Sequence, residues 1–331
     1  MDLSLTDVHA LVAETLIRCR TAEANAAHVA DALIAAELAG QVGHGLRRVP
    51  SYAGQALSGK VDGQAMPEAS VSRPGALMVD AAHGFAYPAL ALAMDWLPGA
   101  AETQGIAVAG ITRSHHAGVA GWFVERLAEH GLAALMFANT PGAMAPPGGT
   151  RPLFGTNPIA FSAPIPDAAP MVVDLSLSTV ARGKIMAAAQ KGEPIPEGWA
   201  TDADGNPTTD PQAALKGMMQ PIGDAKGAAL ALMVEVLAAG LTGATLAGDA
   251  SDFFGADGPP PGTGQLLLAI DPMALGGDSA LARIGALAAA FDGNGTARLP
   301  GRRRQEIAAR VRADGVTIDD ALAAQIDALG R

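Results

Sequence analysis

The chain of 331 residues predicts an α/β fold with additional helical parts at both ends. Through its middle, short runs rich in β-branched and apolar residues alternate with helical stretches. Both ends instead show apolar residues at helical spacing. Hydrophobic residues make up 49% and charged residues 17% of the chain, which is the balance of a folded globular protein.

The N-terminal part predicts three helices. Apolar residues recur at helical spacing after Thr6, which is a candidate N-cap. A second helix follows Thr21 and ends near Gly40. A third covers residues 46–57 and stops at Gly59.

The region from about Pro74 onward predicts the sheet. Its apolar runs are short and bounded by turn residues, and helical stretches lie between them. The predicted strands are 76–80, 106–111, 133–138, 159–163 and 171–175, and the predicted helices between them are 88–96 and 119–130.

The C-terminal part begins with an irregular segment, 192–216, which is rich in Pro, Gly, Asp and Thr. Long loops of this kind inside a compact domain are usually functional or disordered. After it the sequence predicts one strand, 265–270, and four helices, 228–239, 280–291, 302–313 and 319–329.

Composition excludes several classes of protein. The net charge of −11 argues against nucleic-acid binding, which requires clustered cations. The single cysteine, Cys19, cannot form an internal disulfide and favours a reducing compartment. Glu235 interrupts the longest apolar stretch, and the acidic N-terminus does not resemble a secretory signal. We therefore expect a soluble cytoplasmic protein.

Common motifs are missing from the sequence. The dinucleotide fingerprint G-x-G-x-x-G does not occur despite 40 glycines, so an ordinary Rossmann site is disfavoured. The Walker A loop, the G-x-S-x-G elbow and H-E-x-x-H are also absent. Four polar clusters in glycine-rich surroundings remain as candidate sites.

The first cluster surrounds His44 with glycine. Gly43 and Gly45 remove side-chain bulk beside the imidazole, and Arg48 follows one helical turn later. A guanidinium can hold a carboxylate in a fork while a histidine moves a proton, so the pair suits a carboxylate-bearing substrate. The alternative is a helix that ends at a glycine and is followed by a surface histidine.

The second cluster contains His115 and His116, directly after the predicted strand 106–111. Strand ends that lead into helices are where α/β proteins bind ligands. Neighbouring histidine side chains diverge and rarely bind one metal, so no metal site is expected. The alternative is a polar turn capped by Ser114.

The third and fourth clusters contain Asp174 and Lys226. Asp174 ends an apolar strand near the turn that holds Thr156, and it either caps the next helix or pairs with a cation or histidine. Lys226 lies between glycines at the start of helix 228–239, where it can meet an anion such as a phosphate. The alternative for Lys226 is a solvated first turn.

In this order, the clusters resemble the malate/L-lactate dehydrogenase family of the non-Rossmann type. Relatives in it include sulfolactate dehydrogenase, ureidoglycolate dehydrogenase, diketogulonate reductase and the piperideine-2-carboxylate (ketimine) reductases. The likeness extends from about Leu5 to Leu329. The matching segments are GHGLRRVPSY, RSHHAGVAG, GTNPIAFSAP, VVDLSLSTVARGKI, GWATDADGNPTTDP, KGAALALMVEVLAAGLTGA, GTGQLLLAIDP and RLPGRRR.

The resemblance implies a mixed sheet with helices and three parts. Residues 1–73 would form the N-terminal helical part of a substrate and dimer domain, 74–235 the cofactor-binding α/β domain, and 236–331 a C-terminal part that returns to the first domain. The resemblance also implies a homodimer with active sites near the subunit interface. It accounts for the missing fingerprint, because this family binds its cofactor on a different fold.

The implied activity is reduction of a small 2-oxo acid to a 2-hydroxy acid with NADH or NADPH. The alternative substrate is a cyclic imino acid, Δ1-piperideine-2-carboxylate or Δ1-pyrroline-2-carboxylate. A third hypothesis is a non-catalytic protein that kept the fold. The choice between NAD and NADP stays open, because the basic run Arg302, Arg303 and Arg304 suits either a 2′-phosphate or a solvated helix turn.

Matched residue by residue, His44 is implied to donate the proton, Asp174 to orient its ring, and Arg48 to hold the substrate carboxylate. His116 matches the family's second histidine, near substrate and nicotinamide, and Thr156 is also expected at the substrate. The implied cofactor contacts are His116, Thr156, Asp174, Leu175, Ser176, Ser178, Lys226, Gly301, Arg302 and Arg303.

Three positions depart from the family pattern. Gly43 stands where many members carry serine, so a hydroxyl beside His44 is missing. His115 and Ala117 stand where asparagine and phenylalanine are common, which enlarges the pocket and adds a titratable group.

Overall fold

The computed structural model describes residues 1–330. Its strands are β1 (Asp2–Leu3), β2 (Glu68–Arg73), β3 (Ala76–Asp80), β4 (Ile106–Ser114), β5 (Ala133–Ala138), β6 (Ile159–Ile165), β7 (Ala168–Leu175), β8 (Ala200–Thr201), β9 (Pro207–Thr208), β10 (Thr263–Ile270) and β11 (Val316–Thr317). Its α-helices are α1 (Leu5–Arg18), α2 (Glu23–Leu38), α3 (Val49–Ser58), α4 (Ala86–Gln104), α5 (Ala120–Glu129), α6 (Arg182–Lys191), α7 (Pro211–Lys216), α8 (Ala225–Glu235), α9 (Pro272–Leu275), α10 (Gly277–Asp292), α11 (Arg302–Asp314) and α12 (Asp320–Asp327). Two 3₁₀ turns, η1 (Val42–His44) and η2 (Leu46–Arg48), precede α3, and a π turn, η3 (Val236–Gly240), follows α8.

A seven-stranded mixed sheet forms the centre of the molecule, in the order β2-β3-β4-β10-β5-β6-β7. Only β3 and β4 run parallel, and α4 connects them. All other neighbours are antiparallel. The late strand β10 lies between β4 and β5, so the sheet is completed by a segment far along the chain. The predicted α/β fold with a mixed sheet is confirmed.

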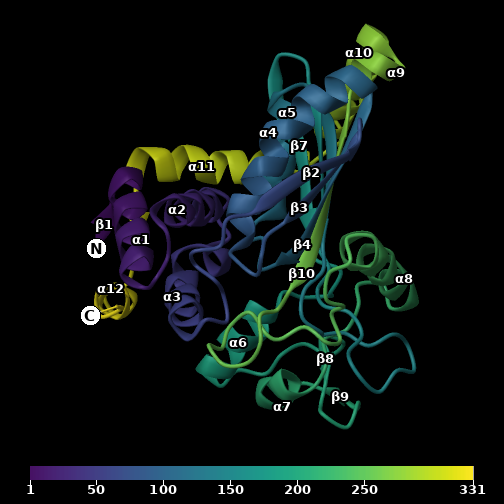
Figure 1. Ribbon diagram of the computed structural model, residues 1–331. Helices are drawn as coiled ribbons and strands as arrows, with labels where there is room; N and C mark the ends of the chain where they lie inside the picture. Colours follow the sequence, from purple (N-terminus) through teal and green to yellow (C-terminus); the bar gives the residue numbers. More distant parts are fainter. Residues whose placement is uncertain (331) are drawn as a thin grey trace.

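Helices cover the sheet, and a separate helical group stands at one end. Helices α4 and α5 pack against the sheet strands, while η3 packs against β10. Helices α1, α2 and α3 gather with α11 and α12 around the two chain ends (Figure 1). There β1 pairs with β11, and the Met1 amino group donates to the Ile318 carbonyl. The N- and C-terminal helical parts therefore pack together, while the boundaries at 73 and 235 stay a prediction.

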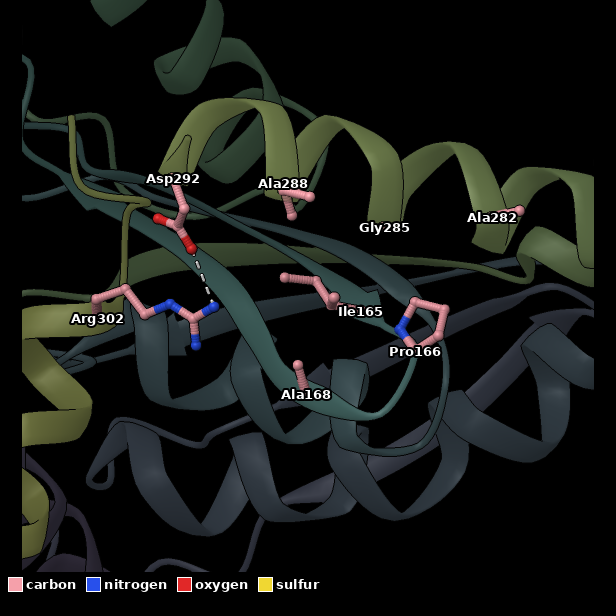
Figure 2. A pocket seen from close by; sticks show the side chains of 9 residues that line it. Ile165, Pro166, Ala168, Ala282, Gly285, Ala288, Asp292 and Arg302 are labelled. Carbon is pink, nitrogen blue, oxygen red and sulfur yellow. Dashed lines mark hydrogen bonds and ion pairs between the residues drawn. The ribbon is translucent and has the colours of Figure 1, made fainter. Parts of the chain in front are cut away.

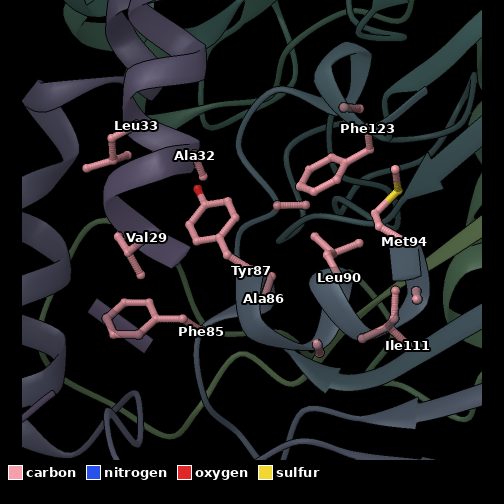
Figure 3. Close-up of a cluster of buried hydrophobic side chains, with 14 of the residues drawn as sticks. Val29, Ala32, Leu33, Phe85, Ala86, Tyr87, Leu90, Met94, Ile111 and Phe123 are labelled. Atoms are coloured by element: carbon pink, nitrogen blue, oxygen red, sulfur yellow. The ribbon is translucent and has the colours of Figure 1, made fainter. Parts of the chain in front are cut away.

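The main hydrophobic core joins the N-terminal helices to the sheet. Val29 and Leu33 of α2 meet the segment from Phe85 to Leu90, and Ile111 of β4 and Phe123 of α5 lie beyond it (Figure 3). Burying each such side chain contributes about 1.5–3 kcal/mol. This core holds α3 and the segment after β4, which carry candidate site residues, on one framework.

The structure corrects three local predictions. The N-cap of α1 is Ser4 and not Thr6, because Ser4 and Asp7 form a capping box that satisfies both backbone amides. Strand β2 was missed because all of its residues are exposed and it forms a sheet edge. Helix α6 was missed in residues 182–191, to which the sequence assigned no element, and its only buried residue is Ile185.

The segment 192–216, predicted to be irregular, contains only the short strands β8 and β9 and the six-residue helix α7. Trp199 packs against a second core cluster there. In residues 1–330, none of the helices combines the length and the apolar composition that a membrane span requires.

Candidate active site

The two candidate histidines lie face to face. His44 ends the 3₁₀ turn η1, and His116 follows β4. Their ring centroids are 5.2 Å apart and their planes differ by 29°. The structure therefore brings together two imidazoles that come from distant parts of the sequence.

A hydrogen-bonded chain of two tyrosines ends at His116. The Tyr52 hydroxyl lies 2.6 Å from His116 Nδ1 and 2.9 Å from the Tyr87 hydroxyl. The arrangement that gives both hydroxyl protons an acceptor has Tyr87 donating to Tyr52 and Tyr52 donating to Nδ1. In that arrangement the proton of neutral His116 is on Nε2, which can then donate a hydrogen bond.

Arg48 supplies a buried positive charge beside the histidines. Its Nε donates to the Gly43 carbonyl at 3.0 Å, and its guanidinium lies 4.5 Å from the centroid of the Phe254 ring. The residue is 8% exposed, and its Nη1 is buried without a hydrogen-bond partner. Within residues 1–330, no carboxylate forms an ion pair with it. This guanidinium is therefore free to bind an anion.

Glu37 packs against the turn that holds His44 and Arg48. The Leu46 amide donates to the Glu37 carboxylate at 2.8 Å. A Cβ at Gly45 would collide with that carboxylate, so this glycine is required for packing and not for ligand access. Gly43, by contrast, faces open space.

Burial and Arg48 keep the imidazoles neutral. Burial, and then the Arg48 charge, lower the pKa of His44 to about 4. The same causes hold the pKa of His116 well below its usual value. Burial lowers the pKa of His115 to about 3, and both of its ring nitrogens lack partners among the rings of Tyr52, Phe85 and Phe253. His115, expected as an added titratable group, is thus a neutral part of an aromatic cluster.

Asp174 lies behind the site and not in hydrogen-bond contact with the His44 ring. Its carboxylate accepts from the Gly121 amide at 2.9 Å and from Gln41 Nε2 at 3.3 Å. Gln41 in turn accepts from the His44 amide. No hydrogen bond joins Asp174 to His44 in the part of the chain described, and both of these donors bond Oδ2. The orienting role implied for Asp174 stays a prediction, and the contact that the structure shows toward the His44 turn passes through Gln41.

Burial raises the pKa of Asp174, although its hydrogen bonds and the nearby Arg304 oppose the shift. Arg304 also pairs with Glu125 at 3.0 Å, and its Nη1 is buried without a partner. A Cβ at Gly121 would collide with both Arg304 and Asp174, so glycine permits their close approach. From the sequence, Arg304 was named only as part of the basic run 302–304, and its position beside Asp174 was not expected.

Three of the predicted cofactor segments lie side by side. The Leu177 amide donates to the Thr156 carbonyl, and the Ile222 amide donates to the Leu177 carbonyl, both at 2.8 Å. Leu175 and Lys226 are exposed there, and the Ser176 and Ser178 hydroxyls are 3.1 Å apart. Thr156, Leu175, Ser176, Ser178 and Lys226 therefore belong to one region of the molecule.

Buried polar contacts fix this region to α8. Glu235 accepts from the side-chain amides of Asn139 and Asn157 and from the Ala247 backbone amide. Asn157 directly follows Thr156 and has a positive φ of 38°. Glu235, the charged residue that interrupts the longest apolar stretch, thus holds α8 to this region through buried hydrogen bonds.

The residues of the predicted cofactor segment from Gly301 to Arg303 have different surroundings. The Val172 amide donates to the Pro300 carbonyl, so the chain passes beside β7, and Gly301 has a φ of 98°. Arg302 pairs with Asp292 at 3.1 Å and lines a shallow depression between α10 and the β6–β7 turn (Figure 2). Arg303 is exposed. Of the basic run, the arginine that reaches Asp174 is Arg304.

Aromatic side chains that line the site, here called the aromatic wall, were not predicted from the sequence; they are Phe253, Phe254 and Tyr52. Residues 251–256, here called the Phe loop, place Phe253 against the rings of His115 and His116, at 5.1 and 5.2 Å, and Phe254 under Arg48. The signal available was a Phe-Phe pair in a glycine-rich loop, in a chain with only 8 phenylalanines. Tyr52 carried no such signal.

The mixed α/β fold, the paired imidazoles and the free guanidinium fit the predicted class, dehydrogenases that act without a Rossmann motif. The family model described as malate/L-lactate dehydrogenase matches residues 3–327. The chain belongs to this family, as predicted.

The chain is similar to relatives with two different activities. The chain is 48% identical to (2R)-3-sulfolactate dehydrogenase (NADP(+)) of Chromohalobacter salexigens over 328 residues, 98% of this chain and 97% of that protein. It is 41% identical to the Δ1-pyrroline-2-carboxylate/Δ1-piperideine-2-carboxylate reductase of Pseudomonas putida, over 95% of this chain and 93% of that protein.

Solved structures with both activities are similar to this chain. The Δ1-piperideine-2-carboxylate reductase from Pseudomonas syringae matches with a TM-score of 0.93 and 38% identity, covering 99% of both chains. The sulfolactate dehydrogenase from Methanocaldococcus jannaschii matches with a TM-score of 0.90 and 29% identity, over 98% of this chain and 95% of that one. The two activities that the sequence left open are both found among relatives.

Proposed function

We propose that this protein uses NADPH or NADH to reduce a small 2-oxo acid to the 2-hydroxy acid, with sulfopyruvate as the first substrate to test. One observation carries the proposal: Arg48 is buried and unpaired beside two stacked imidazoles. A buried guanidinium without an acid is costly, and a substrate carboxylate offsets that cost in a bidentate pair. The sulfolactate dehydrogenase at 48% identity favours the sulfonated acid.

The residues present fit a bound dinucleotide. Exposed Leu175 and Lys226 lie with the hydroxyls of Ser176 and Ser178 on one region, and the unpartnered Nη1 of Arg304 lies beside the N-terminus of α5. A guanidinium N–H without a partner suits an anionic group of the cofactor. The nicotinamide ring, when bound, supplies the hydride. Gly301, Arg302 and Arg303 stay predicted cofactor contacts.

The chain's own groups supply position and the proton. Arg48 holds the substrate carboxylate in a fork, and His116 Nε2–H donates to the substrate oxygen. His44 delivers the proton that converts the developing alkoxide to a hydroxyl. Burial is the larger cause of the low pKa of His44, and the Arg48 charge lowers that pKa further. A carboxylate on Arg48 neutralises this second cause and so shifts His44 toward the protonated imidazole. The carboxylate of Asp174 supports the His44 turn through Gln41.

A cyclic imino acid is the second candidate substrate. The aromatic wall formed by Phe253, Phe254 and Tyr52 offers apolar surface that suits a ring. Imino-acid reductases also stand among both the sequence relatives and the structural neighbours. Reduction of C=N requires the same carboxylate fork and the same proton donor.

We also infer a homodimer in the cytoplasm. The family likeness supports the dimer, and the buried free thiol of Cys19 fits a reducing compartment. Sedimentation of the purified protein tests the dimer.

A substrate panel tests the proposed activity. Sulfopyruvate, pyruvate, oxaloacetate and the two cyclic imino acids are each mixed with NADPH and with NADH, and cofactor absorbance is followed. We expect one class to exceed the other by at least about tenfold in kcat/KM, which is about 1.4 kcal/mol of transition-state binding. Absence of turnover with every pair would overturn the proposal and favour a non-catalytic protein.

A further inference from the structure

The Phe loop is fastened to the helix that follows Arg48. Lys60 Nζ lies 3.3 Å from Asp252 Oδ2 and donates to the Gly255 carbonyl at 3.0 Å. Gln55 Nε2 donates to the same carbonyl, and the Ser58 hydroxyl donates to Ala256. Every one of these contacts comes from α3 or from the two residues after it.

Lys60 is unusual because its ammonium group has no access to water. The exposed fraction of its side chain is 0%, whereas that of Asp252 is 58%. Lysine is almost never fully buried unless it is paired, and an unpaired charge in that position is costly. The pairing with Asp252 therefore constrains the loop more strongly than a surface ion pair does.

Asp252 transmits this constraint to the two phenylalanines. Its other oxygen accepts from the amides of Phe254 and Gly255, at 2.7 and 2.6 Å, and so fixes the turn that follows. That turn aims Phe253 at His116 and Phe254 at the guanidinium of Arg48. Arg48, the proposed carboxylate site, directly precedes α3. Lys60, which holds the Phe loop, follows the end of the same helix.

We propose that Lys60 is a positioning residue, which through Asp252 holds the Phe loop against Arg48 and His116 and so sets affinity for the acid substrate. This inference rests on the proposed function only in taking Arg48 as the carboxylate site. Stacking on Phe254 keeps the planar guanidinium in one orientation, and Phe253 limits the space beside His116.

Oxalate, a carboxylate that does not depend on turnover, tests the proposal. Its Kd is measured by calorimetry for the parent and for K60M and D252N. Methionine fills the buried space without leaving an unpaired cation, and asparagine keeps the oxygen that caps the turn. We expect both variants to weaken oxalate by about 5- to 20-fold, which corresponds to loss of a partly desolvated cation–π contact. D257N, which removes an exposed acid five positions after Asp252, is the matched control and should bind as the parent does.

Two further readouts separate positioning from general damage. NADPH affinity should change by less than about twofold while KM for the acid rises and kcat holds, because the pair acts only on the carboxylate side. The F254L variant should weaken oxalate similarly, and adding K60M to it should cost little more. If K60M does not fold, D252N decides by the same measurements.

Unchanged oxalate binding in a folded K60M or D252N would overturn the proposal, as would equal losses for oxalate and NADPH. If the parent binds oxalate but reduces no acid or imine, the proposed activity fails while the oxalate series still judges Lys60.

Discussion

Burial and the charge of Arg48 together set the protonation of single residues at the site. Arg48 lies over an aromatic ring, donates to a backbone carbonyl, and keeps one buried nitrogen free. Burial, and then the Arg48 charge, lower the pKa of His44 to about 4. We propose that the substrate's carboxylate, by pairing with Arg48, removes the smaller of these two effects.

Changing Arg48 to lysine should raise KM for the acid substrate by about 10- to 100-fold, because a fork that forms two hydrogen bonds becomes a point charge. Steady-state kinetics measures this, with KM for the cofactor as the internal reference. The exposed neighbour offers a control, R47K, which should behave as the parent. An R48K enzyme with parental KM would dismiss the fork.

Removing the imidazole in H44A should lower kcat by about two to four orders of magnitude, the usual contribution of a general acid. Single-turnover kinetics at saturating substrate measures the chemical step. H130A, which removes an exposed histidine at the end of α5, should retain turnover. Near-parental rates in H44A would take His44 out of the mechanism.

The buried histidines make stability fall as the solution is acidified. The pKa of His115 is about 3 in the folded protein and near 6.5 when unfolded, so the unfolded chain binds the proton first. Stability from this residue is present above pH 6.5 and declines below it. Between pH 7.5 and 5 the free energy of unfolding should drop by about 2 kcal/mol on its account.

Urea unfolding of the parent and of H115F measures this decline. Raised carboxyl pKa values, such as that of Asp174, act in the opposite direction but are common to both proteins. The parent should therefore lose about 2 kcal/mol more than H115F over this range. Parallel pH profiles would show that His115 is not buried as a neutral group.

Individual site residues could be predicted where the candidate side chains lie close together in the sequence. The sequence pointed to His44 with Arg48 and, separately, to His116, and the structure brings all three together. The positions of Tyr52, Lys60 and Arg304 depend on contacts between distant segments, which no local pattern reveals.

Secondary-structure elements were predictable where they bury a repeating face. Strands β3 to β7 and helices α2 and α5 begin and end close to the predicted residues, because their buried positions follow the predicted pattern. Strand β2 and helix α6 bury too little to leave such a pattern. Pairing order, with β10 in the centre, depends on contacts across the whole chain.

Helix α8 offers a test at this scale, because Glu235 anchors it to the turn that follows Thr156. In E235Q the new amide group faces the side-chain amides of Asn139 and Asn157, so one buried donor loses its acceptor. The free energy of unfolding should fall by about 1–3 kcal/mol. Urea denaturation measures it, with the exposed Glu129 of α5 changed in E129Q as control. Equal stability of E235Q and the parent would refute the anchor.

The whole molecule should be stabilised by its cofactor. Binding to the folded state alone, at one hundred times Kd, adds about 2.7 kcal/mol. For a chain of this size, Tm should rise by several degrees with NADPH or NADH in differential scanning calorimetry. ATP, which shares the adenylate but lacks the nicotinamide, serves as the comparison. A Tm that neither dinucleotide moves would support the non-catalytic alternative.

The central place of β10 has a consequence for how the protein is made. Until residue 270 leaves the ribosome, the half-sheets β2-β3-β4 and β5-β6-β7 have no strand to join them, and β4 and β5 each present an open edge. Synthesis at about 5–20 residues per second leaves those edges bare for many seconds. We therefore expect chains truncated before β10 to aggregate more readily than the full chain, because the edges of β4 and β5 stay unpaired in them.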